Sequence, residues 1–127
     1  MKKILITDDM QSWINFHTNA VKAIFGEDVK IDTAISAQEG YSKLLENKEK
    51  PYDYLITDMQ MESDFLPKMA GEWLIEQAKT LPFCYKTKII IISASYNIKQ
   101  ISEIYGVDYI PKSIASVSLD AYKEFIF

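Results

Sequence analysis

The chain has 127 residues, which is enough for one domain with one sizeable core. Apolar residues make up 48% and charged residues 25%, the proportions of a water-soluble globular protein. A net charge of −4, with no cluster of Lys or Arg, argues against a nucleic-acid-binding surface. The apolar run near the N-terminus is too short for a secretory signal or a membrane helix, so we expect a cytoplasmic protein without a membrane partner. A single cysteine, Cys84, excludes an internal disulfide.

The first half of the chain predicts three strands and two helices. Residues 4–7 are apolar on both faces, which is typical of a strand buried between two helix layers. Apolar residues then recur at helical spacing from residue 10 to about 25, where Gly26 ends the helix. Residues 29–34 predict a second strand, and Ser36 with Glu39 forms a capping box that begins a second helix. The third predicted strand covers residues 52–57.

The second half continues the alternation. It predicts, in order, a loop over 59–69, a helix over 70–81, a strand over 89–92, a short helix ended by Gly106, a strand over 108–110 and one amphipathic helix from about 114 to 127. Five alternating βα units predict an α/β, doubly wound fold. Its parallel sheet has helices on both faces and right-handed crossovers.

Polar residues follow four of the five predicted strands. Asp8 and Asp9 follow the first strand, Asp58 the third, Ser93 the fourth and Lys112 the fifth. Because the carboxyl ends of parallel strands meet at one edge of the sheet, these side chains are expected to lie together. Three neighbouring carboxylates repel one another unless a cation lies among them, and hard oxygen ligands suit Mg²⁺.

An Mg²⁺ site that takes only some of its ligands from protein leaves room for phosphoryl oxygens. A carboxylate such as Asp58 can itself be the nucleophile and form an acyl phosphate. The Lys112 ammonium would stabilise charge on the transferring group, and the Ser93 hydroxyl could donate to a phosphoryl oxygen.

These residues stand in the segments ILITDDM, YLITDMQM, IIIISAS and DYIPKS. With all four in order along five alternating units, the chain resembles the receiver domains of response regulators in two-component signalling. The resemblance implies a flavodoxin-like, five-stranded sheet in the order 2-1-3-4-5. It also implies one stand-alone receiver domain over residues 1–127, without an output domain.

The resemblance also implies a role for each matching residue. Asp58 would be the phospho-acceptor, and Lys112 would contact a phosphoryl oxygen. Asp9 would bind Mg²⁺ directly and Asp8 through water, with the Gln60 backbone carbonyl as a further ligand. Ser93 would be the hydroxyl switch residue and Tyr109 the aromatic switch residue.

The same resemblance predicts the partners. The phosphoryl donor would be a histidine kinase or a histidine phosphotransfer protein, and phosphorylation would alter the binding of an unidentified downstream protein. The chain would be a monomer or weak homodimer. It would be no enzyme beyond its own phosphotransfer and slow autodephosphorylation.

Three features depart from the usual receiver pattern. The segment Glu62–Met69 enlarges the loop after Asp58, Ser113 stands where a Pro usually follows the lysine, and the segment before Tyr109 is one residue shorter than usual. The sequence leaves open whether the Lys112–Ser113 bond is cis.

Other interpretations remain at this stage. Asp8 and Asp9 could merely cap the first helix. A receiver-like scaffold that acts without phosphorylation is a second function. An Mg²⁺-dependent phosphatase with an aspartate nucleophile is a third, although its usual Asp-x-Asp pattern is absent. His17 is expected to be structural, and Trp13, Trp73 and Cys84 are expected in or near the core.

Overall fold

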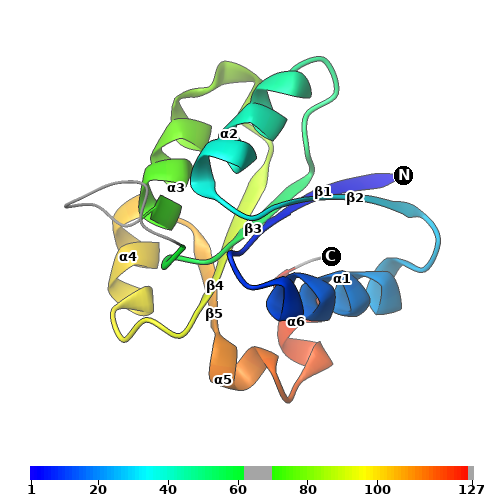
Figure 1. Cartoon of the computed structure of the whole chain (residues 1–127), viewed down its shortest axis with the longest axis vertical. Coiled ribbons are helices and arrows are strands. Elements are labelled where there is room, and N and C mark those ends of the chain that lie inside the picture. Colours follow the sequence, from blue (N-terminus) through cyan, green and yellow to red (C-terminus); the bar gives the residue numbers. More distant parts are fainter. Residues whose placement is uncertain (62–69, 126–127) are drawn as a thin grey trace.

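The computed structural model describes residues 1–61 and 70–125. Its elements alternate along the chain as expected (Figure 1). They are β1 (Lys2–Thr7), α1 (Gln11–Phe25), β2 (Val29–Ala34), α2 (Ala37–Glu46), β3 (Tyr54–Thr57), α3 (Ala70–Thr80), the 3-10 turn η1 (Pro82–Cys84), β4 (Lys88–Ser93), α4 (Ile98–Tyr105), β5 (Asp108–Pro111), α5 (Lys112–Ala115) and α6 (Leu119–Phe125).

The strands form one parallel sheet in the order β2-β1-β3-β4-β5, which confirms the predicted fold class. In the register, Thr7 of β1 pairs with Thr57 of β3, and Ser93 of β4 pairs with Pro111 of β5. The residues that follow these pairs therefore leave the sheet at the same edge.

Two apolar cores lie on opposite faces of the sheet, because successive strand residues point to opposite sides. Leu5 packs with α2, α3 and α4 on one face, whereas its neighbour Ile4 packs with α1 and α6 on the other. Figure 1 shows the same division of the helices. Each fully buried Ile or Leu stabilises the fold by roughly 1.5–3 kcal/mol, so both layers hold the central strands in place.

Local signals explain most of the element ends. The Ser36 hydroxyl accepts a hydrogen bond from the Glu39 amide at 3.1 Å and so caps α2. Gly26 and Gly106 follow α1 and α4, both with φ of 65°, a conformation that glycine adopts without strain. The run of isoleucines in β4 is typical of a strand buried on both faces.

The prediction of one continuous C-terminal helix is wrong. The chain forms the single turn α5, leaves the helical path over residues 116–118 and begins again as α6. Ser116, Val117 and Ser118 all have modest helix propensity, since serine competes for backbone hydrogen bonds and valine loses rotamer freedom. The amphipathic pattern did not reveal this break.

The enlarged loop Glu62–Met69 lies outside the described residues. The short turn η1 was not predicted from the sequence. Within residues 1–61 and 70–125, we find no helix that has both the length and the apolar character needed to span a membrane.

Candidate functional site

Asp8, Asp9 and Asp58 gather at the carboxyl edge of the sheet. Asp8 and Asp58 each follow one member of the Thr7–Thr57 pair on neighbouring strands, so the sheet register itself brings them side by side. Each of the three residues offers a carboxylate oxygen within 4.8 Å of the others. Asp8 and Asp58 are buried, and Asp9 is half-buried.

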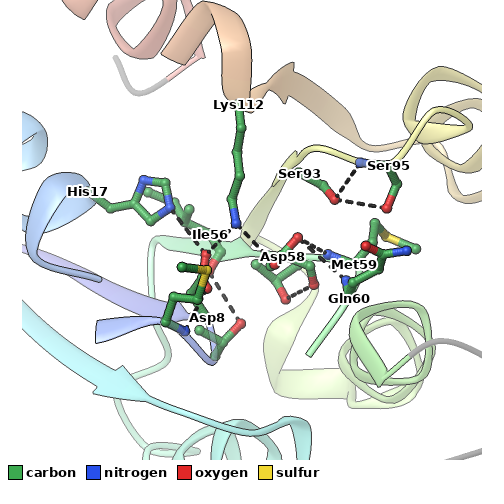
Figure 2. A network of polar contacts seen from close by, with 12 residues as sticks. Asp8, His17, Ile56, Asp58, Met59, Gln60, Ser93, Ser95 and Lys112 are labelled. Carbon is green, nitrogen blue, oxygen red and sulfur yellow. Dashed lines mark hydrogen bonds and ion pairs between the residues drawn. The ribbon is translucent and has the colours of Figure 1, made fainter. Parts of the chain in front are cut away.

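Lys112 lies between two of these carboxylates (Figure 2). Its Nζ is 3.1 Å from Oδ2 of Asp8 and 3.1 Å from Oδ2 of Asp58. Lys112 is the first residue of α5 and directly follows β5, so it reaches the site from the far side of β4. The ammonium therefore offsets part of the repulsion between the two buried carboxylates.

Asp58 is held by contacts on both of its oxygens. Oδ1 accepts hydrogen bonds from the Met59 amide at 2.7 Å and the Gln60 amide at 3.4 Å, while Oδ2 faces Lys112. Burial raises the pKa of Asp58, and Asp8 raises it further, against the opposing effects of Lys112 and Ser93. The ionised Asp58 is therefore destabilised in its surroundings, a condition that often marks a reactive carboxylate.

Asp8 has the opposite balance. Burial raises its pKa, but the contacts from His17, the Met10 amide and Lys112 together hold the pKa below its usual value. Its Oδ1 accepts the Met10 amide at 3.0 Å. Its Oδ2 has no hydrogen bond of good geometry from any group that the structure describes, although Lys112 lies at ion-pair distance.

The predicted switch residues lie in different surroundings. The buried Ser93 hydroxyl donates to Ser95 Oγ at 3.1 Å and accepts the Ser95 amide at 3.2 Å (Figure 2). Tyr109 pairs with Ile91 in the sheet and is half-buried. It lines a hollow beside Pro111 and Phe125, away from the aspartates.

An open depression of about 430 Å³ lies over the aspartates. Its lining is Asp9, Met10, Trp13, Asp58, Gln60, Met61, Ala94 and Lys112. Trp13, expected in or near the core, is half-buried against the core on the α1 side, and its ring also lies 4.9 Å from Lys112 Nζ, a distance suited to a cation–π contact. The helical spacing of Trp13 with apolar residues did not reveal its contact with Lys112. Gln60 is exposed at the rim, where its carbonyl was expected to serve as a ligand.

Gly71 packs α3 directly against the backbone that carries Asp58. Its amide donates to the Met59 carbonyl at 3.1 Å. A Cβ at this position would overlap the Asp58 carbonyl oxygen and lie 2.7 Å from Met59 Cα. Only glycine allows so close an approach, a requirement that the sequence pattern alone does not reveal.

Comparisons with known proteins identify this architecture. No family model and no curated protein matches the sequence. Among solved structures, a response regulator receiver domain protein from Clostridium thermocellum is 24% identical over 99% of this chain and 94% of its own, with a TM-score of 0.71. The receiver domain of Francisella response regulator 1452 is 25% identical over 96% and 90%, with a TM-score of 0.67. A receiver protein from Burkholderia phymatum is 16% identical over 99% and 92%, with a TM-score of 0.77.

The chain has the receiver-domain fold. The similarity in fold extends over nearly the whole length of this chain. One local feature of this receiver fold is that Lys112 begins a helical turn instead of preceding a proline.

The residues of this receiver fold suit a hard divalent cation. Oxygens that bind one Mg²⁺ at about 2.0–2.1 Å lie at most about 4.2 Å apart, so carboxylate oxygens that lie within 4.8 Å of one another need no more than a small shift or one bridging water. Oδ2 of Asp8, which has no hydrogen bond from the described residues, is available to interact with such a cation. The open depression leaves space for the waters that Mg²⁺ retains.

Proposed function

We propose that the chain is a phospho-accepting receiver domain that takes a phosphoryl group onto Asp58 and thereby changes its binding to a partner. The observation that carries this proposal is the shared ammonium. Lys112 Nζ lies 3.1 Å from both Asp8 and Asp58, at the floor of a depression that a phosphoryl group can enter.

The chemistry follows from the contacts of Asp58. A carboxylate oxygen attacks phosphorus, and the bond from phosphorus to its donor breaks with the electron pair leaving on the donor. The Met59 amide fixes the other side of the carboxylate, which keeps the nucleophile oriented. Burial raises the pKa of Asp58, so its site stabilises the ionised carboxylate less well than water does.

Charge on the phosphoryl oxygens needs cations nearby. The Lys112 ammonium can donate to a phosphoryl oxygen on Asp58 while it keeps its contact with Asp8. Asp8, Asp9, Asp58 and the Gln60 carbonyl are the proposed ligands of Mg²⁺, with Asp8 acting through water. When bound, Mg²⁺ would neutralise charge on the transferring group.

We further propose that Ser93 and Tyr109 report the modification. The Ser93 hydroxyl now donates to Ser95, so donation to a phosphoryl oxygen would require it to leave that partner. Tyr109 lies on the strand next to Ser93 and is half-buried, so part of the residue is exposed to solvent and becomes less so if the ring moves inward. The proposed donor is a histidine kinase or histidine phosphotransfer protein. We propose that the phosphorylated chain acts as a switch that controls the binding of a downstream protein and is not a turnover enzyme.

The test is phosphorylation by acetyl phosphate with Mg²⁺, followed by intact-mass spectrometry. The wild-type chain should gain one phosphoryl group, and Asp58→Asn should gain none. Asp28→Asn is the matched control, because Asp28 is 79% exposed and lies at the other end of the molecule from the site. A wild-type chain without a mass gain, or an Asp58→Asn chain with one, would reject the proposal.

A partner whose affinity is the same for wild type and Asp58→Asn would instead favour a scaffold that acts without phosphorylation. Steady turnover of a phosphomonoester would favour a phosphatase.

A further inference from the structure

A buried pair of polar side chains connects α6 to Asp8. His17 of α1 is 1% exposed, and Tyr122 of α6 is fully buried. Nδ1 of His17 lies 2.8 Å from the Tyr122 hydroxyl, and Nε2 lies 3.8 Å from Oδ2 of Asp8. Figure 2 shows the imidazole of His17 beside Asp8, on the side away from Asp58. His17 does not line the depression over the aspartates, so it contacts Asp8 from within the protein.

The contacts of His17 favour one arrangement of protons in this pair. A neutral imidazole has one N–H donor and one acceptor nitrogen. Burial and the nearby Asp8 raise the pKa of Tyr122, so its hydroxyl keeps its proton and can donate to Nδ1. Nε2 then carries the ring proton and directs it toward the Asp8 carboxylate. The other tautomer would place a nitrogen lone pair against a carboxylate oxygen, which is electrostatically unfavourable.

Asp8 would be less constrained without this contact. Its Oδ1 is held by the Met10 amide, but Oδ2 has no hydrogen bond from the described residues and is oriented by Lys112 and His17. Lys112 also faces Asp58, so its position depends on what occupies the site. His17 is fixed by burial and by Tyr122, so it is the constant partner of Asp8.

We propose that Tyr122 and His17 are positioning residues that hold the Asp8 carboxylate in the orientation in which it helps to bind a divalent cation through water. The affinity of the site then depends on how α6 is seated against α1. This inference rests on the proposed function, in which Asp8 helps to hold Mg²⁺. Partners that orient metal ligands typically change metal affinity by about 10–100-fold when they are removed.

The test measures the Mg²⁺ affinity of the full chain by calorimetry, together with its thermal midpoint. Two changes at His17 separate the two ends of the ring, since glutamine can place a donor near Nε2 and asparagine a group near Nδ1. His17→Gln should stay within about threefold of wild type, while His17→Asn and Tyr122→Phe should bind Mg²⁺ about tenfold more weakly or worse.

Tyr52→Phe is the matched control. Tyr52 is 2% exposed and donates to Asp32 at 2.6 Å, so its loss also removes a partly buried hydrogen bond of a tyrosine hydroxyl, but away from Asp8, Asp9 and Asp58. It should lower the thermal midpoint and leave Mg²⁺ affinity unchanged. Tyr122→Phe removes a single oxygen and is the variant most compatible with folding.

Three outcomes overturn the inference. Wild-type affinity in both His17→Asn and Tyr122→Phe would show that the pair is merely structural. A loss of affinity in Tyr52→Phe equal to that in Tyr122→Phe would show a general effect of stability. Absence of Mg²⁺ binding to the wild-type chain would overturn the proposed function as well, so the two failures are distinguishable.

Discussion

Substitution of Gly71 by alanine should displace the backbone that carries Asp58. The new Cβ would lie 2.7 Å from Met59 Cα and would overlap the Asp58 carbonyl oxygen, whereas real Cβ atoms keep at least 3.0 Å. The obstacle is backbone at the end of β3, so it cannot be relieved by rotation of a side chain. Overpacking of this kind costs roughly 1–3 kcal/mol. Alanine in a helix recovers at most about 1 kcal/mol relative to glycine.

We therefore expect Gly71→Ala to lower the free energy of unfolding by up to about 2 kcal/mol, the larger overpacking cost less the full helix gain of alanine. Relief of the overlap must move the backbone of Asp58, and a misplacement near 1 Å can slow a reaction by about 100-fold. Labelling by acetyl phosphate should therefore fall by roughly 10–100-fold.

Urea unfolding and intact-mass time courses measure these two effects. Gly40→Ala is the matched control, because the atoms nearest to its Cβ would belong to the side chains of Thr7 and Leu74, at 3.0 and 3.1 Å, and not to backbone. Gly40→Ala should retain near wild-type labelling. If Gly71→Ala matched wild type in both stability and labelling rate, the reasoning about this close approach would be refuted.

Three further predictions concern the charges and the indole of the site. Lys112→Met leaves the buried Asp8 and Asp58 without their ammonium, so it should destabilise the chain by about 3–5 kcal/mol in the absence of Mg²⁺. Added Mg²⁺ should stabilise Lys112→Met by more than it stabilises the wild-type chain. The control Lys88→Met breaks a half-exposed ion pair with Asp108 and should lower the free energy of unfolding by less than about 1 kcal/mol. Equal losses of stability in the two variants would contradict this prediction. Asp58→Asn should raise the urea midpoint of unfolding at neutral pH, because the ionised form of a carboxyl with a raised pKa destabilises the fold. The difference in midpoint from wild type should become smaller as the pH falls and Asp58 is protonated. An Asp58→Asn chain that is less stable than wild type at neutral pH would count against this prediction. Trp13 contacts Lys112 and lines the depression, so Mg²⁺ should change the tryptophan fluorescence of Trp73→Phe, which keeps Trp13. It should not change the fluorescence of Trp13→Phe, which keeps Trp73. The reverse result would show that Trp13 does not report Mg²⁺ binding.

Alternation and strand-end chemistry were sufficient to predict the fold class and the gathering of the three aspartates, whereas the strand order came from the family resemblance. Both rest on rules that act at short range or through sheet register, as with Asp8 and Asp58 beyond the Thr7–Thr57 pair. The capping of α2 by Ser36 was equally readable, because cap and helix lie next to each other in the sequence.

The contacts that tune the site were not readable. Trp13 and His17 lie on an apolar helix stripe, and nothing local distinguishes a ring that packs from a ring that contacts Lys112 or Asp8. Tyr122 lies 105 positions from His17 and falls within the predicted C-terminal helix, with nothing in the sequence to mark it as a partner of His17. The break between α5 and α6 depends on weak local preferences, which tertiary packing readily overrides.

The pairing of Thr7 with Thr57 has a consequence for how this chain can change. Adjacent strands lie about 4.8 Å apart, and a shift by one residue turns every side chain of a strand to the opposite face. An insertion within β1 or β3 would therefore send one aspartate into an apolar core. Insertions between elements carry no such penalty, since loop length costs little free energy. Length variation should thus accumulate in the connecting segments, and the two strands should keep their spacing even where the rest of the sequence diverges.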